Sequence, residues 1–67
     1  MGRIHIMRFD KETSIRLVAR SLIREFGASA LGVVKERLAE YEASGEERNV
    51  GFWRSVESAV RKILKAR

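Results

Sequence analysis

The sequence predicts an all-helical protein that folds as a three-helix bundle. Gly27 and Gly45 divide the chain into three amphipathic segments, and each segment carries apolar residues at helical spacing. The chain contains no proline, so nothing of that kind breaks the segments internally. We expect helices at about 11–26, 29–43 and 47–65, with short connections that let them fold back on each other.

A chain of 67 residues is long enough for one domain only. We expect residues 1–9 to be an N-terminal extension and residues 10–67 to be a single helical domain. Residues 3–9 begin with the polar/apolar alternation of a strand, although a strand needs a partner strand. Met7 could also be the start codon, and residues 1–6 would then be a disordered tail or no part of the protein.

The first helix has a plausible N-cap in Asp10 and an expected left-handed C-terminal residue in Gly27. Its apolar stripe comprises Ile15, Val18, Ala19, Leu22, Ile23 and Phe26. Leu17 lies nearly opposite this stripe. It is either an exposed leucine that the fold tolerates or part of a contact with another molecule.

The second helix has Ser29 as a candidate cap, and Ser44 and Gly45 close it. Its stripe comprises Leu31, Val34, Leu38 and Tyr41. Gly32 within it indicates a close approach of a neighbouring helix, because glycine otherwise costs a helix about 1 kcal/mol relative to alanine. Val33 lies off the stripe and raises the same question as Leu17.

The third helix has a core face that is wide for a helix packing on only two others. This face comprises Phe52, Trp53, Val56, Val60, Ile63 and Leu64. Glu46, Glu47 and Asn49 occupy the expected start of the helix, where acidic groups complement its dipole. The width of the apolar arc indicates a further partner surface.

Self-association, or docking on a partner protein, is the stabilising device that the composition leaves to so short a chain. A domain of this size buries only about 60% of the surface that its unfolded form exposes. Cysteine is absent and His5 is the only histidine, so neither a disulfide nor a histidine-based zinc site is available. The candidate dimer contacts are Leu17, Val33 and Phe52, and Ile4 and Ile6 could join them. Both a monomeric bundle and a dimer that exchanges helices remain open.

The net charge of +5 is unevenly distributed along the chain. Residues 1–26 carry six basic and three acidic groups, residues 27–47 carry two and five, and residues 48–67 carry six and one. Basic residues recur at helical spacing along one side of the first helix and along one side of the third. We call these two lines of residues the basic columns. The candidates for contact with nucleic acid or another anion are Arg16, Arg20, Arg24, Arg54, Arg61 and Lys65, with Lys62 and Arg67 nearby. The alternative is an ordinary solvated surface.

Catalysis is not indicated by the residues present. The serines fall on helix surfaces or caps, and the single histidine lies in the extension, so no nucleophile has a base beside it. The five glycines are scattered and form no phosphate loop. Glu36 and Glu40 lie one turn apart, but three short helices offer little cleft for acid/base work, so a solvated face is the expected role. We expect a protein that is not an enzyme and has no cofactor, metal or small-molecule substrate.

The membrane is not expected to be a partner. The longest stretch without charge runs from Phe26 to Val34, far short of the roughly 20 apolar residues that span a bilayer. The first six residues lack the apolar region of a signal peptide, so we expect a cytoplasmic protein. Peripheral attachment through the basic third helix ranks below the other hypotheses, because the apolar arc of that helix is assigned to the core.

The segment from Val18 to Leu64 resembles a family of short uncharacterised bacterial helical proteins. The matching residues are Leu22, Ile23, Gly27, Ala30, Arg37, Leu38, Gly45, Gly51, Trp53, Val56, Ala59 and Leu64. That family has a glycine-containing turn followed some eight residues later by a tryptophan, as Gly45 and Trp53 are placed here. It usually has Asp after the turn glycine, where this chain has Glu46. The resemblance implies a compact helical fold and no known activity.

Residues 3–41 also resemble ribbon-helix-helix DNA-binding proteins, in which paired strands of a dimer read the major groove. By that resemblance Arg3, His5 and Met7 would face bases, and Ser29 would touch phosphate. The first helix is longer than is usual in that family, and the third helix has no place in its minimal fold.

Two functions follow as hypotheses. The first is a small, non-enzymatic, cytoplasmic protein-interaction domain that associates with itself. The alternative is a small basic DNA-binding protein that uses the basic columns or an N-terminal ribbon. The sequence leaves the partner and the biological process open.

Overall fold

The structure is a computed structural model that describes residues 11–66, and 96% of these residues are helical. Helix α1 covers Lys11–Phe26, the short 3-10 helix η1 covers Gly27–Ser29, α2 covers Ala30–Ser44 and α3 covers Glu47–Ala66. The all-helical prediction is confirmed for this part of the chain. The predicted strand at 3–9 and the cap at Asp10 lie outside the described residues.

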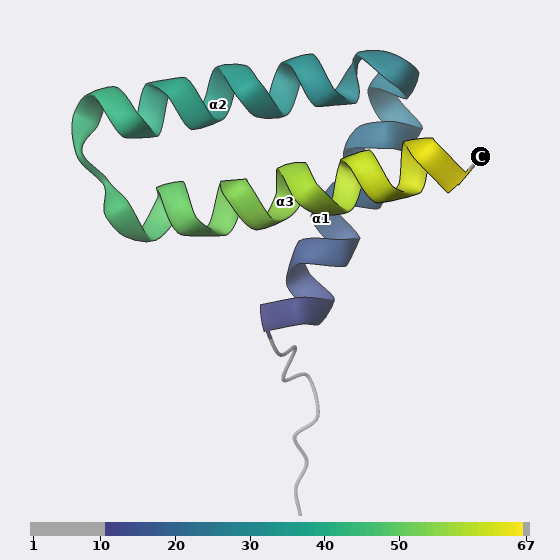
Figure 1. The fold of residues 1–67 in the computed structure, drawn as a ribbon, viewed down its shortest axis with the longest axis horizontal. Coiled ribbons are helices and arrows are strands. Elements are labelled where there is room, and N and C mark those ends of the chain that lie inside the picture. Colours follow the sequence, from purple (N-terminus) through teal and green to yellow (C-terminus); the bar gives the residue numbers. More distant parts are fainter. Residues whose placement is uncertain (1–10, 67) are drawn as a thin grey trace, which may run out of the picture.

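The predicted three-helix bundle is wrong, and the chain forms a helical hairpin instead. Helical conformation continues from Lys11 to Ser44, and the second arm of the hairpin is Glu47–Ala66. The left-handed conformation expected at Gly27 is present, with φ +60°, but it leads into η1 and not into a reversal of the chain. As a result α1 runs across the back of α3, while α2 and α3 lie side by side (Figure 1).

The reversal of the chain occurs at Gly45, as the sequence predicts. Gly45 is left-handed with φ +74°, and its N–H donates to the carbonyl of Glu42 at 3.3 Å. The N–H of Glu46 donates to the carbonyl of Tyr41 at 3.1 Å. These two bonds are the pair that defines a Schellman motif, which satisfies the last carbonyls of α2.

The carboxylate of Glu46 holds the turn against the start of α3. Asn49 Nδ2 donates to Glu46 Oε1 at 2.8 Å, and Ser44 Oγ lies 3.1 Å from Glu46 Oε2. The first intrahelical bond of α3 runs from the Val50 N–H to the Glu46 carbonyl at 3.0 Å. A negative group at this end of α3 is favourable, because the helix dipole is positive there.

Only alanine and valine are completely buried among the described residues. The core consists of Ala19, Ala30, Val34, Val56 and Val60. The larger apolar side chains pack around it and stay partly exposed; they are Ile15, Val18, Leu22, Ile23, Leu31, Phe52, Trp53, Ile63 and Leu64, together with the smaller Ala59. The described part of the chain therefore does not cover its own large apolar residues.

Several local predictions are corrected by the structure. Phe26 is 43% exposed, because it ends α1 at the junction with η1. Ser29 is helical and its side chain makes no capping hydrogen bond, because the chain enters α2 from a 3-10 turn. A Cβ atom at Gly32 would have nothing within 4 Å, so no neighbouring helix requires the small size of this residue. Ala30, which was not predicted as part of the core stripe, is buried.

Candidate functional site: the groove between α1 and α3

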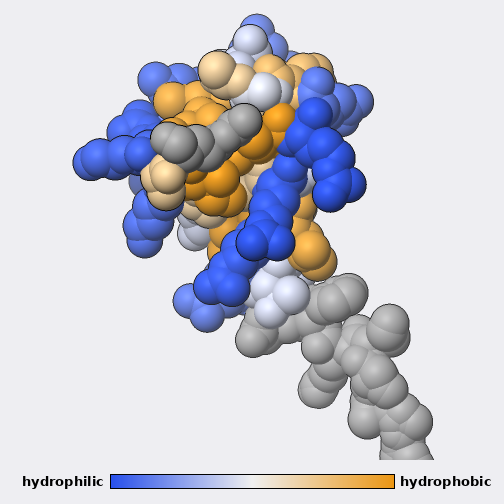
Figure 2. Space-filling view, turned by 90° about the vertical axis from the view of Figure 1, so that its right-hand side faces the viewer, coloured by the Kyte–Doolittle hydropathy of each residue, from blue (hydrophilic) through white to orange (hydrophobic). Residues whose placement is uncertain are grey.

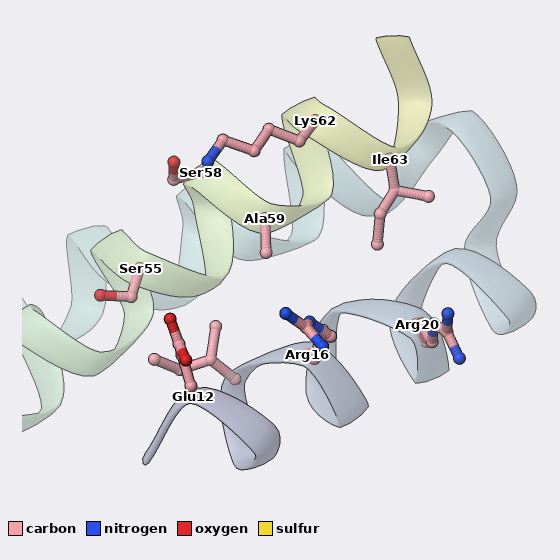
Figure 3. Close-up of a pocket in the computed structure, with 9 residues that line it drawn as sticks. Glu12, Arg16, Arg20, Ser55, Ser58, Ala59, Lys62 and Ile63 are labelled. Atoms are coloured by element: carbon pink, nitrogen blue, oxygen red, sulfur yellow. The ribbon is translucent and has the colours of Figure 1, made fainter. Parts of the chain in front are cut away.

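A groove of about 510 Å³ lies between α1 and α3. Its lining residues are Glu12, Ile15, Arg16 and Arg20 from α1, and Ser55, Ser58, Ala59, Lys62 and Ile63 from α3 (Figure 3). The apolar members belong to the shell that packs on the core, and the polar members flank them. The groove thus combines an apolar lining with a polar rim that carries three cations and one carboxylate.

The helical period explains why these residue types meet there. Ile15 packs on the core, and Arg16 follows it by one residue, about 100° further around α1. Arg20 lies one turn beyond Arg16 on the same side. On α3, Ala59 and Ile63 pack on the core, and Ser55 and Lys62 lie beside them in the groove lining.

Two arginines of the predicted basic column on the first helix reach this groove. All three arginines are exposed, and Arg16 and Arg20 line the groove whereas Arg24 does not. Lys62, predicted only as a neighbour of the second column, contributes the third cation. Within residues 11–66, these three groove cations form no ion pair.

The second predicted column lies elsewhere on the molecule. Arg54 Nη2 lies 3.2 Å from Glu42 Oε2 and links α3 to α2, and Arg61 Nη2 lies 2.9 Å from Glu57 Oε2 within α3. Lys65 is exposed and lies outside the groove lining. Two residues of this column are therefore paired with glutamates, and none of its three residues lines the groove.

The candidate dimer contacts differ in exposure. Leu17 is 49% exposed on α1, which fits either a tolerated surface leucine or a contact with another molecule. Val33 and Phe52 are partly buried, and Phe52 packs against the core. Hydrophobic surface is also visible between hydrophilic side chains at the end of the molecule where α3 ends (Figure 2).

The aromatic residues near the hairpin turn form one cluster. The ring centroids of Tyr41 and Trp53 lie 6.4 Å apart in a stacked arrangement, and Phe52 meets Trp53 edge-on at 5.9 Å. The guanidinium carbon of Arg37 lies 6.0 Å from the centroid of the Trp53 ring. Trp53 is thus engaged by contacts within the chain, and it packs against the core while remaining partly exposed.

The structure shows no candidate metal site and no buried polar side chain among the residues that it describes. Residues 11–66 contain no buried polar or charged side chain and no group of acidic or histidine residues that could hold a metal ion. Glu36 and Glu40 are both exposed. None of the helices α1 to α3 is long and apolar enough to cross a membrane.

The sequence identified Arg16 and Arg20 as candidate site residues, but it did not show which other residues would form a groove with them. Ser55, Ser58 and Glu12 were missed as members of a site, and Lys62 was named only as a neighbour of the second column. Their flanking position beside each apolar stripe was visible in the sequence. The pairing of α1 with α3 was not, because it depends on the angle that η1 imposes.

Comparison with family models, with curated proteins and with solved structures finds no match for this chain. The resemblances to short bacterial helical proteins and to ribbon-helix-helix proteins remain predictions from the residues named above.

Proposed function

We propose that this chain is a small, non-enzymatic, cytoplasmic protein-interaction domain that associates with itself. The observation that carries the proposal is the size of the buried residues. The core holds only alanine and valine, while isoleucine, leucine, phenylalanine and tryptophan side chains remain partly exposed around it. Covering these side chains with a second copy would remove further apolar surface from water.

The energetic reason is the free energy gained when that apolar surface is removed from water. Burial of apolar area contributes about 25 cal/mol per Å², so covering about 400 Å² adds about 10 kcal/mol before the costs of association. Those costs take up a large part of the gain, and the remainder sets the affinity. A short chain with a small core has more to gain from this contact than a large domain has.

The candidate contacts for this association are Leu17, Val33 and Phe52. Leu17 is the most exposed large apolar residue in the described part of the chain. The test is the mass of the full chain in solution, measured by sedimentation velocity between about 1 and 100 µM. A mass that rises with concentration supports the proposal, and a constant monomer mass contradicts it.

A small DNA-binding protein is the second candidate, and the convergence of Arg16, Arg20 and Lys62 on one groove favours it. Three cations at one place can neutralise phosphates and release counterions without reading a sequence. Glu12 in the same groove counts against this candidate, because a carboxylate repels phosphate.

Fluorescence anisotropy of a labelled mixed-sequence duplex tests the DNA candidate at low and at physiological salt. The variant Arg16→Ala/Arg20→Ala should weaken binding, and its matched control is Arg54→Ala/Arg61→Ala, which removes the same charge from residues already paired with glutamates. Absence of binding even at low salt would exclude the candidate.

A further inference from the structure

We propose that the groove between α1 and α3 receives the acidic side of α2 from a second copy of this chain. The inference rests on the proposed self-association and assigns it to two specific surfaces. The first surface is the groove with Arg16 and Arg20 on its rim. The second, called here the acidic face of α2, consists of Val33, Glu36 and Glu40.

The acidic face of α2 is turned away from the buried residues of that helix. Residues i, i+3 and i+7 share one side of a helix, so Val33, Glu36 and Glu40 lie within an arc of about 60°. The centre of this arc lies about 110° around the helix from Ala30 and Val34, the buried residues of α2. Glu36 and Glu40 are exposed, and Val33 is partly exposed.

The charges of the two surfaces match in spacing as well as in sign. Glu36 and Glu40 are four residues apart on one helix, and Arg16 and Arg20 are four residues apart on the other. The members of each pair are therefore separated by about 6 Å along the helix axis, slightly more than one turn. Two glutamates of an incoming helix can meet two arginines of the groove in one register.

The apolar part of each surface completes the match. Val33 precedes Glu36 by about one turn and would contact the lining formed by Ile15, Ala59 and Ile63. A nucleic acid offers phosphates to the rim but no aliphatic side chain for this lining. The apolar lining therefore favours an amphipathic acidic helix over a phosphate backbone, whereas the carboxylate of Glu12 repels both kinds of partner alike.

Glu36 and Glu40 are available for the contact, because the described part of the fold does not pair them. Glu42 and Glu57 are paired with Arg54 and Arg61, and Glu46 accepts from Asn49 in the turn. Within residues 11–66, Glu36 and Glu40 make no hydrogen bond through their side chains and no ion pair. The same is true of Arg16, Arg20 and Lys62 in that part of the chain.

The contact joins two different surfaces, so it is heterologous: each copy offers one groove and one acidic face. Such contacts close into a ring when the rotation permits and otherwise extend into a chain of copies. This property makes a decisive experiment available, because the two halves of the interface can be altered in separate molecules.

The experiment reverses the charge of each surface in the full-length chain. One variant is Arg16→Glu/Arg20→Glu and the other is Glu36→Lys/Glu40→Lys. Each variant alone should sediment as a monomer at a concentration where the unaltered chain associates, since its groove and its acidic face now repel. An equimolar mixture should associate again, because each altered groove then finds an altered face of opposite charge.

The matched control is Arg24→Glu/Lys65→Glu, which changes the net charge as the groove variant does but at exposed residues outside the groove. This control should associate like the unaltered chain. Circular dichroism verifies that each variant keeps its helices. If a reversed variant does not, the neutral pairs Arg16→Gln/Arg20→Gln and Glu36→Gln/Glu40→Gln replace it, and each should weaken association roughly 2- to 30-fold.

The outcomes separate the inference from the proposed function. If the unaltered chain is a monomer throughout, self-association itself is wrong and the inference falls with it. If the unaltered chain associates and the reversed variants do too, or their mixture does not recover, only the assignment to these surfaces is overturned. If the groove variant loses DNA binding while its self-association is unchanged, the groove belongs to nucleic acid and the inference is overturned.

Discussion

The ring of Tyr41 stacks on the ring of Trp53, with centroids 6.4 Å apart and an angle of 24° between the ring planes. Tyr41 belongs to α2 and Trp53 to α3, so this contact joins the two arms of the hairpin close to their turn. Trp53 is also the only tryptophan of the chain. Its fluorescence therefore reports directly on whether the hairpin is closed.

Replacing the tyrosine should measure what the ring contact contributes. Tyr41→Leu keeps an apolar side chain at this position and removes the stacking, so the free energy of unfolding should fall by about 1 kcal/mol. Urea denaturation followed through Trp53 fluorescence measures the change. An unaltered unfolding midpoint would mean that the stacked rings add nothing beyond apolar burial.

The glycines of α2 and of its turn should respond in opposite directions to the same substitution. Gly45→Ala places a Cβ on a residue with φ +74° and should destabilise the protein by about 1–2 kcal/mol. Gly32→Ala should stabilise it by up to about 1 kcal/mol, because Gly32 is helical and has open space around it. Thermal unfolding of the two variants beside the unaltered chain gives both values, and a loss of stability in Gly32→Ala would show that this residue does adjoin another surface.

Val60 and Phe26 both belong to apolar stripes in the sequence, but they differ in how deeply the structure buries them. Val60 is completely buried, so Val60→Ala should cost about 2 kcal/mol through lost apolar burial and the space left behind. Phe26 is 43% exposed, so Phe26→Ser should cost less than Val60→Ala despite its greater loss of bulk. Chemical denaturation at low protein concentration checks the order of the two variants, and the reverse order would contradict the burial described here.

The helices were predictable from the sequence because their ends have local causes. Gly45 needs no tertiary contact to end α2, since its left-handed conformation and the Schellman bonds are local. Gly27 is left-handed for the same kind of reason. The arrangement of the helices was not predictable, because Gly27 leads into a 3-10 turn that bends the chain without reversing it.

The sequence identified some residues of the candidate site, but it did not show which of them lie close together in the fold. The sequence shows Arg16, Arg20 and Arg24 at a spacing of four residues, but only the first two line the groove. The sequence makes Arg54 a candidate for contact with an external anion, whereas the structure pairs it with Glu42 across the hairpin. Contacts of this kind depend on which helix faces lie opposite each other, and one-dimensional spacing does not contain that information.

The thermal stability of the chain should depend on its concentration if copies of the chain associate. An associating chain is stabilised by mass action, so its thermal midpoint should rise as the concentration increases from about 1 to 100 µM. Added salt should reduce this dependence, because the ion pairs proposed for the contact are close to solvent. A thermal midpoint that does not change with concentration would indicate that each chain folds alone.

The most direct test of self-association is the mass of the full chain in solution, measured by sedimentation equilibrium over the same concentrations. The chain has a mass of 7.7 kDa. We expect the weight-average mass to rise to at least twice this value at the highest concentration, because the large apolar side chains around the small core become covered. A mass that stays at 7.7 kDa throughout would contradict self-association.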